Sequence, residues 1–238
     1  MSGGVLRPKR FWKEARAEER PEGFALLLDG REARTPDKNL LLAPNRALGE
    51  AMAAEWGAQG ETLDFETLPV TRAVNLAIDR LPATREAVID DAAAYGGSDA
   101  LAHRTEEGEL ADLERAAWDP LLAWAAEALG APLEPVGGIM PKDQAPESLA
   151  ALRAAVAAVS DLQLIALHEL TTLSGSLVLA LAVARGRLTP EEGWRLAMLG
   201  EEWQAARWGR DEEAEARMAR RRDAFLRAAR LWTLASGA

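Results

Sequence analysis

Residues 161–209 read DLQLIALHELTTLSGSLVLALAVARGRLTPEEGWRLAMLGEEWQAARWG, and this stretch decides the fold that we expect. Its apolar run, residues 176–184, predicts a buried helix closed by Gly186, because a left-handed glycine commonly ends a helix. Thr189, Pro190 and Glu192 predict the start of a second helix, since they form a capping box with proline at the first helical position. The positions that recur at helical spacing along this second helix are Trp194, Met198, Glu201, Ala205 and Trp208. The stretch therefore predicts a buried pair of helices with a rim of tryptophan and carboxylate, which suits a protein-binding surface better than a reaction centre.

The composition of the 238 residues narrows the class of protein. With 48% hydrophobic and 28% charged residues, the chain can bury a full core in one or two domains. Its formal net charge of -10 argues against binding to nucleic acid or to an anionic membrane surface. The chain has no cysteine, which excludes disulfides and thiolate metal sites. The longest apolar run is far shorter than the ~20 residues that cross a bilayer, so we expect no membrane insertion.

The N-terminal part predicts a small domain that mixes strands and helices. Residues 10–43 are β-like, and within them the apolar segment 24–28 precedes Asp29 and Gly30, a strong hairpin signal. Asn45 is the expected cap of the helix that follows. Thr71 is expected to cap a further helix with an apolar stripe at Val74, Ile78 and Leu81. We place the domain boundary after that stripe, which gives an N-terminal α/β domain over residues 1–81 and a helical domain over residues 82–238.

Helical periodicity continues through the predicted C-terminal domain. Besides the pair above, we expect helices over residues 83–95, 106–129, 149–159 and 211–234. Pro120 lies inside the second of these, so a kink or break is expected there. Prolines and glycines over residues 132–146, including Pro141, predict a long irregular connection. The predicted fold class is α+β, a small mixed α/β N-terminal domain with a β-hairpin followed by a mainly α-helical C-terminal domain.

The sequence shows no recognisable catalytic arrangement. His168 and Glu169 begin like a zinc-protease motif, but Thr172 stands where the second histidine is required. No glycine-rich stretch leads into Lys-Ser or Lys-Thr, and residues 174–176 lack the glycine spacing of a nucleophile elbow. We therefore predict no enzymatic activity, no catalytic residue, no cofactor and no metal. The alternative is a hydrolase or small-molecule-binding protein with a cleft between the two domains that uses Asp90, Asp91, His168 and Glu169.

One acidic pair differs from the others in its surroundings. Glu201 and Glu202 are bracketed by three tryptophans at positions 194, 203 and 208. Tryptophan is enriched among the residues that dominate protein interfaces, and a carboxylate beside apolar surface can pair with an arginine of a partner. On spacing alone, the simpler interpretation is that these tryptophans belong to the core.

Several short segments occur in the order found in one known family. In chain order they are residues 9–13 (KRFWK), 28–31 (LDGR), 55–56 (EW), 68–72 (LPVTR), 118–121 (WDPL), 170–176 (LTTLSGS), 202–204 (EWQ) and 208–209 (WG). Each segment alone is a weak signal, but their shared order along the chain is specific. The chain resembles the ATP12-type family, the assembly chaperones of the F1-ATPase that handle its alpha subunit.

This resemblance implies a non-enzymatic chaperone with a small mixed N-terminal domain and a helical C-terminal domain. Members of the family bind the unassembled alpha subunit transiently and hold it until the beta subunit displaces them. The resemblance places the partner-binding acidic position at Glu202, with Trp203, Gln204 and Trp208 as neighbours in the same matched segment. Mitochondrial relatives carry an import presequence and act in the matrix. Because the matched region here begins by Lys9, we expect a bacterial cytoplasmic protein.

Overall fold

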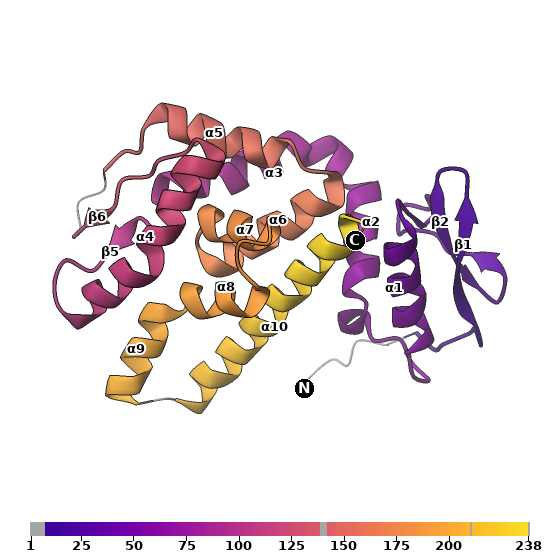
Figure 1. The fold of residues 1–238 in the computed structure, drawn as a ribbon. Coiled ribbons are helices and arrows are strands. Elements are labelled where there is room, and N and C mark those ends of the chain that lie inside the picture. Colours follow the sequence, from indigo (N-terminus) through magenta and orange to yellow (C-terminus); the bar gives the residue numbers. More distant parts are fainter. Residues whose placement is uncertain (1–7, 139–141, 210, 238) are drawn as a thin grey trace. The chain divides into compact units, whose positions relative to one another are not determined.

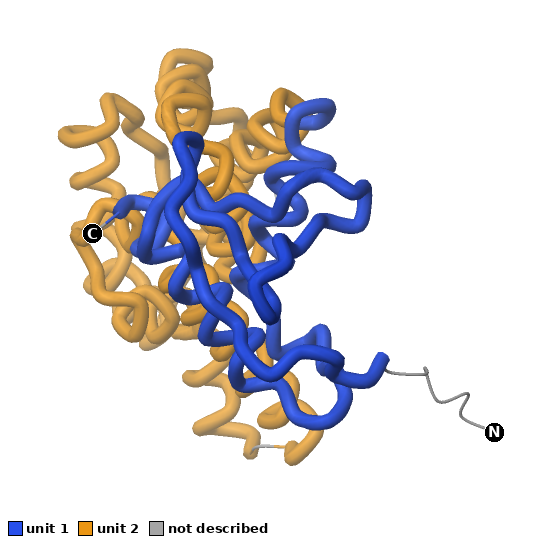
Figure 2. Tube along the Cα trace, turned by 90° about the vertical axis from the view of Figure 1, so that its right-hand side faces the viewer, with its two compact units in different colours: residues 1–84, 233–238 blue, residues 85–232 orange. Residues whose placement is uncertain are grey.

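The computed structural model describes residues 8–138, 142–209 and 211–237 and shows a protein of helices with one small antiparallel sheet (Figure 1). The chain forms two compact units, residues 1–84 with 233–238 and residues 85–232 (Figure 2). The first unit contains the sheet and the second is mainly helical, which confirms the predicted fold class.

The units divide the chain within α3 (Leu81–Ala94), at whose first residue the predicted domain boundary lies. The last residues of the chain were expected in the helical domain, but they group with the first unit. Asn45 explains this grouping, because its side-chain Nδ2 donates a hydrogen bond to the carbonyl of Leu234 at 2.9 Å.

The sheet of the first unit is organised around β2 (Gly23–Leu28). β1 (Ala15–Arg20) pairs with it antiparallel along its whole length, while β3 (Arg31–Glu32) and β4 (Leu42–Ala43) pair with its end and its start. Asp29 and Gly30, which join β2 to β3, have φ values of 48° and 78°. Two successive positive φ values are what a type I′ turn requires, so the predicted hairpin is confirmed.

α1 (Arg46–Gly57) packs on β1 and β2. Its predicted cap is confirmed, because Asn45 Oδ1 accepts a hydrogen bond from the Leu48 N–H at 2.9 Å. Gly49 marks the closest approach of helix and sheet, since a Cβ at this position would lie 2.7 Å from Phe24 Cβ. The apolar face of α1 therefore covers the sheet and forms the core of this unit.

The helix after a 3₁₀ turn (η1, Phe65–Thr67) is α2 (Pro69–Asp79), and the prediction that Thr71 caps it is wrong. α2 begins at Pro69, and Thr71 lies buried in its first turn. The cap comes from α1, where the Glu55 carboxylate accepts hydrogen bonds from the N–H groups of Val70 (2.7 Å) and Thr71 (2.9 Å). A carboxylate at this position also favours the positive end of the helix dipole.

The basic-aromatic segment near the start of the chain is fastened to the end of α1. Trp12 is buried, and its ring centroid lies 4.9 Å from that of Trp56. Arg10 donates to the carbonyl groups of Gly57 (3.2 Å) and Trp12 (3.0 Å). Phe11, between these two anchors, is 78% exposed. Arg10 and Trp12 thus serve the folding of the first unit.

The buried centre of the second unit is α7 (Leu177–Ala184), whose side chains from Leu177 to Val183 are all buried. The elements that pack against it are η2 (Tyr95–Ser98), α4 (Glu109–Leu129), α6 (Asp161–Ser174) and α8 (Pro190–Ala197). The same unit contains α5 (Pro146–Ala157) and most of α10 (Glu212–Ala235) (Figure 1). The apolar run at residues 176–184 therefore forms a helix that is buried on every side.

Residues 161–209 form four helices where two were predicted. Gly175, with φ 72°, ends α6, and Ser176 Oγ caps α7 by accepting a hydrogen bond from the Leu179 N–H at 2.9 Å. The second predicted helix begins with the expected capping box of Thr189 and Glu192. It is divided at Met198, where α8 ends and α9 (Leu199–Trp208) begins.

α4 continues through Pro120 as a single helix, so of the expected kink or break, the break does not occur. Trp118, Leu121 and Leu122 are buried on either side of the proline, and this tertiary packing outweighs the local preference. The region predicted as irregular contains one short strand, β6 (Val136–Gly137), parallel to β5 (His103–Arg104). Pro141 of the same predicted connection lies outside the described residues.

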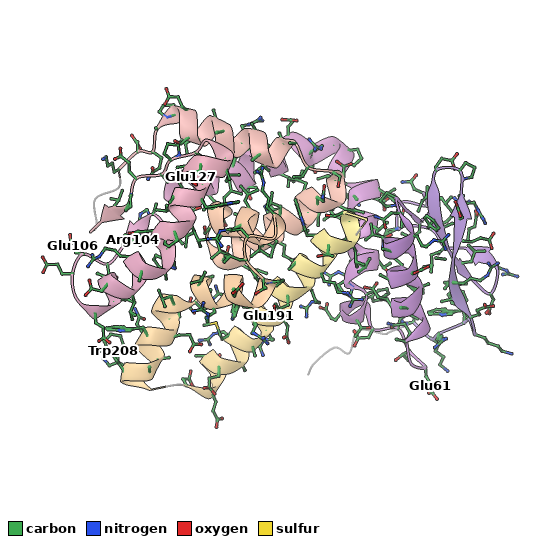
Figure 3. All side chains as sticks on the ribbon, in the orientation of Figure 1. Glu61, Arg104, Glu106, Glu127, Glu191 and Trp208 are labelled. Carbon is green, nitrogen blue, oxygen red and sulfur yellow. The ribbon has the colours of Figure 1, made fainter. Side chains whose placement is uncertain are left out.

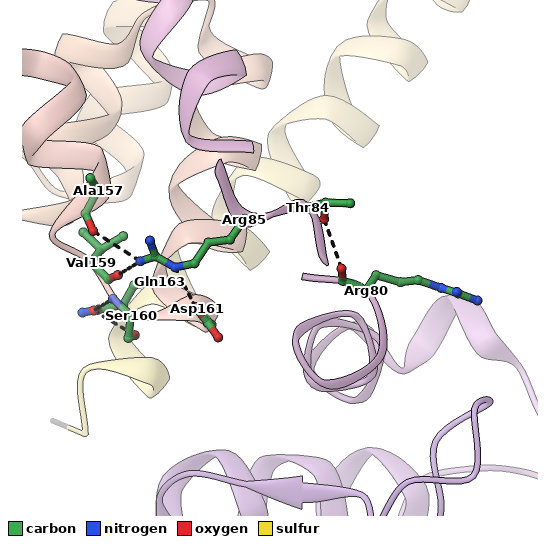
Figure 4. A network of polar contacts seen from close by, with 8 residues as sticks. All are labelled: Arg80, Thr84, Arg85, Ala157, Val159, Ser160, Asp161 and Gln163. Carbon is green, nitrogen blue, oxygen red and sulfur yellow. Dashed lines mark hydrogen bonds and ion pairs between the residues drawn. The ribbon is translucent and has the colours of Figure 1, made fainter. Parts of the chain in front are cut away.

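The turn between α5 and α6 is held by Arg85 on α3 (Figure 4). Its guanidinium donates to the carbonyl groups of Ala157 (3.3 Å) and Val159 (2.7 Å) and to the Asp161 carboxylate (3.0 Å). Carbonyls at the end of a helix carry partial negative charge, so a cation there is stabilising. One side chain therefore links three helices of the second unit.

Candidate protein-binding site

The candidate site lies on α9, whose position depends on the helix before it. The Glu192 carboxylate accepts a hydrogen bond from the Thr189 N–H at 2.9 Å, and this bond lowers the pKa of Glu192. Trp194 then points into the core, 7% exposed, with its ring centroid 5.6 Å from that of Phe225. α8 is thereby anchored at its start and in its middle, and it fixes where α9 begins.

α9 has no buried residue. Of the four predicted partner-binding residues, Glu202, Gln204 and Trp208 are exposed and Trp203 is partly buried. Trp208 is 74% exposed, which is unusual for so large an apolar side chain (Figure 3). The four side chains belong to one helix and its last turn, so the structure brings them together on one element.

Trp203 and Trp208 form an ordered cluster with Arg207 on α9. The rings of Trp203 and Trp208 meet edge to face, with centroids 6.0 Å apart. The Arg207 guanidinium lies over the Trp203 ring at 4.3 Å and forms an ion pair with Glu109 at the start of α4. Trp203 Nε1 is buried, and no hydrogen-bond partner for it lies among the described residues. These contacts hold the aromatic rings in place at the surface.

The neighbouring carboxylates Glu201 and Glu202 have different surroundings. Glu201 pairs with Arg221 on α10 at 3.3 Å, and Arg221 also donates to the Leu173 carbonyl at 3.1 Å. This ion pair ties Glu201 to the body of the second unit. Glu202 is exposed, and its backbone N–H donates to the Met198 carbonyl at 2.9 Å in the first turn of the helix. The Glu201 carboxylate thus takes part in a contact between α9 and α10.

The alternative site, the acidic and histidine residues on α3 and α6, is only partly assembled. His168 Nε2 lies 2.7 Å from Asp91 Oδ2, so these two side chains do meet. Asp90 instead pairs with Arg153 on α5 at 2.8 Å. All four residues belong to the second unit. An open pocket lies elsewhere, lined by Arg104, Thr105, Glu106, Glu107 and Gly138.

Arg104 and Asp99 have buried charged side chains, and no signal in the sequence points to Arg104. The Arg104 side chain is 7% exposed, pairs with Asp119 at 2.8 Å and lies over the Trp118 ring at 5.2 Å. Burial lowers the pKa of Arg104, and the nearby Asp119 opposes that shift. Both contacts are to α4, so Arg104 fastens β5 to that helix. No sequence pattern marks a loop arginine as buried.

Asp99 is fully buried at the start of α7. Its carboxylate accepts hydrogen bonds from the N–H groups of Leu101 and Val178, each at 3.0 Å. Burial raises the pKa of Asp99, while hydrogen bonds from Ser176 and from these N–H groups act against the rise. The side chain satisfies donors at the buried end of a helix, which is a structural role.

Among the described residues, no group of three or more histidine, aspartate or glutamate side chains is placed to hold a metal ion. In the same part of the chain, every helix is too short or too polar to cross a bilayer.

Comparison with protein families gives one matching model. The model described as ATP12 chaperone protein matches residues 9–126. A mitochondrial protein of the fission yeast Schizosaccharomyces pombe, atp12, is 25% identical over 219 residues, which cover 87% of this chain and 75% of that protein.

Solved structures give a higher similarity. The crystal structure of Atp12 from Paracoccus denitrificans is 43% identical, with a TM-score of 0.92, and the match covers 96% of this chain and 98% of that one. A mutant of the same Paracoccus protein matches equally well. A chaperone candidate from Agrobacterium tumefaciens is also 43% identical, with a TM-score of 0.89 over 95% of this chain and 85% of that one.

Proposed function

Because this chain belongs to the family of ATP12 chaperones, which act in F1-ATPase assembly, we propose that it binds the unassembled alpha subunit of that enzyme. In this proposal it covers a surface of the alpha subunit that would otherwise aggregate, and the beta subunit later replaces it. A subunit without its neighbours exposes the apolar surface meant for them, and such surfaces associate non-specifically.

The observation that carries the proposal is the exposed aromatic cluster on α9. Trp208 is 74% exposed, yet its ring meets Trp203, which is itself held under Arg207. A tryptophan fixed in this way loses little conformational freedom when a partner covers it. Tryptophan and arginine are also the residue types most enriched where interfaces derive their binding energy.

Glu202 is proposed as the charged contact of this surface. It is exposed, one residue from the edge of the aromatic cluster. A carboxylate next to apolar surface can accept a bidentate pair of hydrogen bonds from a partner's arginine, which fixes the orientation of the complex. Gln204 is exposed on the same helix and is proposed as an additional polar contact.

We propose further that the chain acts by binding alone, without catalysis. The relatives are named as chaperones, which supports this proposal. We also propose a bacterial cytoplasmic location, because the structural relatives at 43% identity come from bacteria. The fission yeast relative is a mitochondrial protein.

The test is to mix the purified chain with purified alpha subunit and to follow complex formation by gel filtration and aggregation by light scattering. We expect a complex and less aggregation. Glu202→Lys and Trp208→Ala are each expected to weaken the complex by roughly tenfold or more, as for residues central to an interface. Glu127→Lys, an exposed substitution on α4 with the same charge change, is the matched control.

Circular dichroism separates loss of binding from loss of folding. Each variant is expected to keep the helical signal and the melting temperature of the wild type, because both side chains are exposed. The proposal is wrong if the wild-type chain forms no complex with folded alpha subunit. A Glu202→Lys variant that binds as well as Glu127→Lys would remove Glu202 from the site.

A further inference from the structure

The second unit exposes two large apolar side chains among its described residues, Leu113 on α4 and Trp208 on α9, which are 40% and 74% exposed. Single exposed apolar residues are common and need no explanation. These two, however, lie on helices that pack against each other and are joined by the ion pair of Arg207 with Glu109. Figure 3 shows Trp208 on α9 near the start of α4.

The ion pair makes one continuous surface of the two helices. Glu109 and Leu113 are four residues apart on α4 and therefore share a face, one turn from each other. Arg207 reaches Glu109 from α9 while its guanidinium covers Trp203. We refer to Trp208, Trp203, Arg207 and Leu113 as the apolar strip, because Leu113 lies one turn of α4 from the carboxylate that pairs with Arg207.

This strip has an acidic border on the side of α4. Glu106 and Glu107, in the loop before α4, are exposed and have no ion-pair or hydrogen-bond partner among the described residues. The nearest cation in sequence, Arg104, lines the same pocket as these two carboxylates, but its side chain is only 7% exposed and pairs with Asp119 on α4 at 2.8 Å. Unpaired carboxylates beside an apolar strip create a negative potential that favours a cationic partner.

We infer that the binding surface extends from α9 across Leu113 to Glu106 and Glu107, and that it takes a segment of the alpha subunit in which basic side chains flank an apolar one. This inference rests on the proposed function for the identity of the partner, and it adds the second half of the surface and the chemistry of the segment bound. The apolar side chain of the segment covers the strip, and its basic side chains meet the loop carboxylates.

The same charges argue against a second copy of the chain as the occupant. In a symmetric dimer over this strip, each copy would bring Glu106 and Glu107 to the same interface. Like charges that face each other across an interface are unfavourable, and the chain as a whole carries a net charge of -10.

The test compares two pairs of variants in binding kinetics with immobilised alpha subunit. Leu113→Ser is paired with Leu76→Ser, because Leu76 on α2 is exposed to a similar extent, 44%. The double variant Glu106→Gln, Glu107→Gln is paired with the double variant Glu22→Gln, Glu61→Gln. This control removes the same charge from exposed positions of the first unit. Circular dichroism and gel filtration check folding and oligomeric state.

Leu113→Ser is expected to raise the dissociation rate roughly threefold to tenfold, since contact residues act mostly through dissociation. The double glutamine variant is expected to slow association several-fold at about 50 mM salt and hardly at all at about 0.5 M, where charges are screened. Both control variants are expected to bind like the wild type.

Three results would overturn the inference. One is wild-type binding by both test variants while Trp208→Ala still weakens the complex, which would confine the surface to α9 and leave the proposed function intact. Another is an association rate that does not depend on salt, which would exclude a basic segment. The third is a wild-type dimer that Leu113→Ser dissociates, which would make a second copy the occupant. Absence of any wild-type complex would instead refute the proposed function.

Discussion

Replacing Gly193 with alanine tests how closely α7 and α8 pack. Gly193 lies inside α8 and is buried. An added Cβ would overlap Val183 Cγ2 of α7 and would lie 3.4 Å from Phe225 Cζ and 3.6 Å from Leu179 Cδ2. Carbon atoms attract each other best at about 3.5–4.0 Å, so only the first of these contacts is repulsive.

Two effects of opposite sign decide the outcome. Alanine is favoured over glycine inside a helix by about 0.5–1 kcal/mol. An extra methyl group in a packed core costs about 1–3 kcal/mol. Val183 cannot easily turn away, because a β-branched side chain in a helix has one preferred rotamer. We therefore expect Gly193→Ala to lower the free energy of unfolding by about 0.5–2 kcal/mol.

Gly200→Ala is the matched control. Gly200 lies inside α9, and a Cβ there would meet nothing within 4 Å. Only the preference of a helix for alanine over glycine applies, so the free energy of unfolding of this variant is expected to rise by about 0.5–1 kcal/mol. Urea unfolding of the full chain, followed by the helical signal in circular dichroism, gives the free energy of unfolding of both variants.

The close packing of α7 with α8 is refuted if Gly193→Ala is as stable as Gly200→Ala. If both variants lose stability, the expected gain from placing alanine in a helix is wrong, and the experiment does not then measure the packing of α7 with α8. Opposite shifts of the two unfolding midpoints, at an unchanged slope, are the result that the structure requires.

The remaining predictions concern carboxylates that accept hydrogen bonds from backbone N–H groups, and each is checked by urea unfolding. Hydrogen bonds from the backbone N–H groups of Glu14 and Lys13 lower the pKa of Asp29, so its stabilisation is present at neutral pH and is lost as the pH falls below about 4; Asp29→Asn should flatten this loss. Burial raises the pKa of Asp99, so its contribution has the opposite sign, and the advantage of wild type over Asp99→Ala should grow as the pH falls from 7. At pH 7 this variant should lose about 1–3 kcal/mol, because two buried N–H groups lose their acceptor; equal stability would refute the role. Glu55→Ala should cost about 1–2 kcal/mol through loss of the α2 cap, with Glu55→Gln intermediate, and no loss would show that Pro69 alone starts the helix.

Features set by neighbouring residues could be predicted from the sequence. The Asp29–Gly30 turn, the Asn45 cap and the capping box of Thr189 with Glu192 each depend on two to four consecutive positions. Side chains that act across the fold could not be predicted in this way. Glu55 caps a helix that begins well after it in the chain, and Asp99 caps one that begins still further on.

The helix breaks explain why the candidate site was only partly predictable. Helical spacing placed Trp194, Met198, Glu201 and Trp208 on one face, which holds only for an unbroken helix. Because α8 ends at Met198, the face is not continued into α9: Trp194 and Met198 are buried, whereas Glu201 and Trp208 are exposed. Helical spacing alone therefore could not tell which tryptophans belong to the core and which lie at the surface.

The bond from Asn45 to the Leu234 carbonyl has a consequence for synthesis on the ribosome. Asn45 begins the helix that covers the sheet, and its bond partner lies 189 residues later in the chain. A nascent chain that has not yet reached Leu234 therefore lacks this bond, although every strand of the first unit has already been synthesised. The first unit gains this contact only after the whole second unit has been translated.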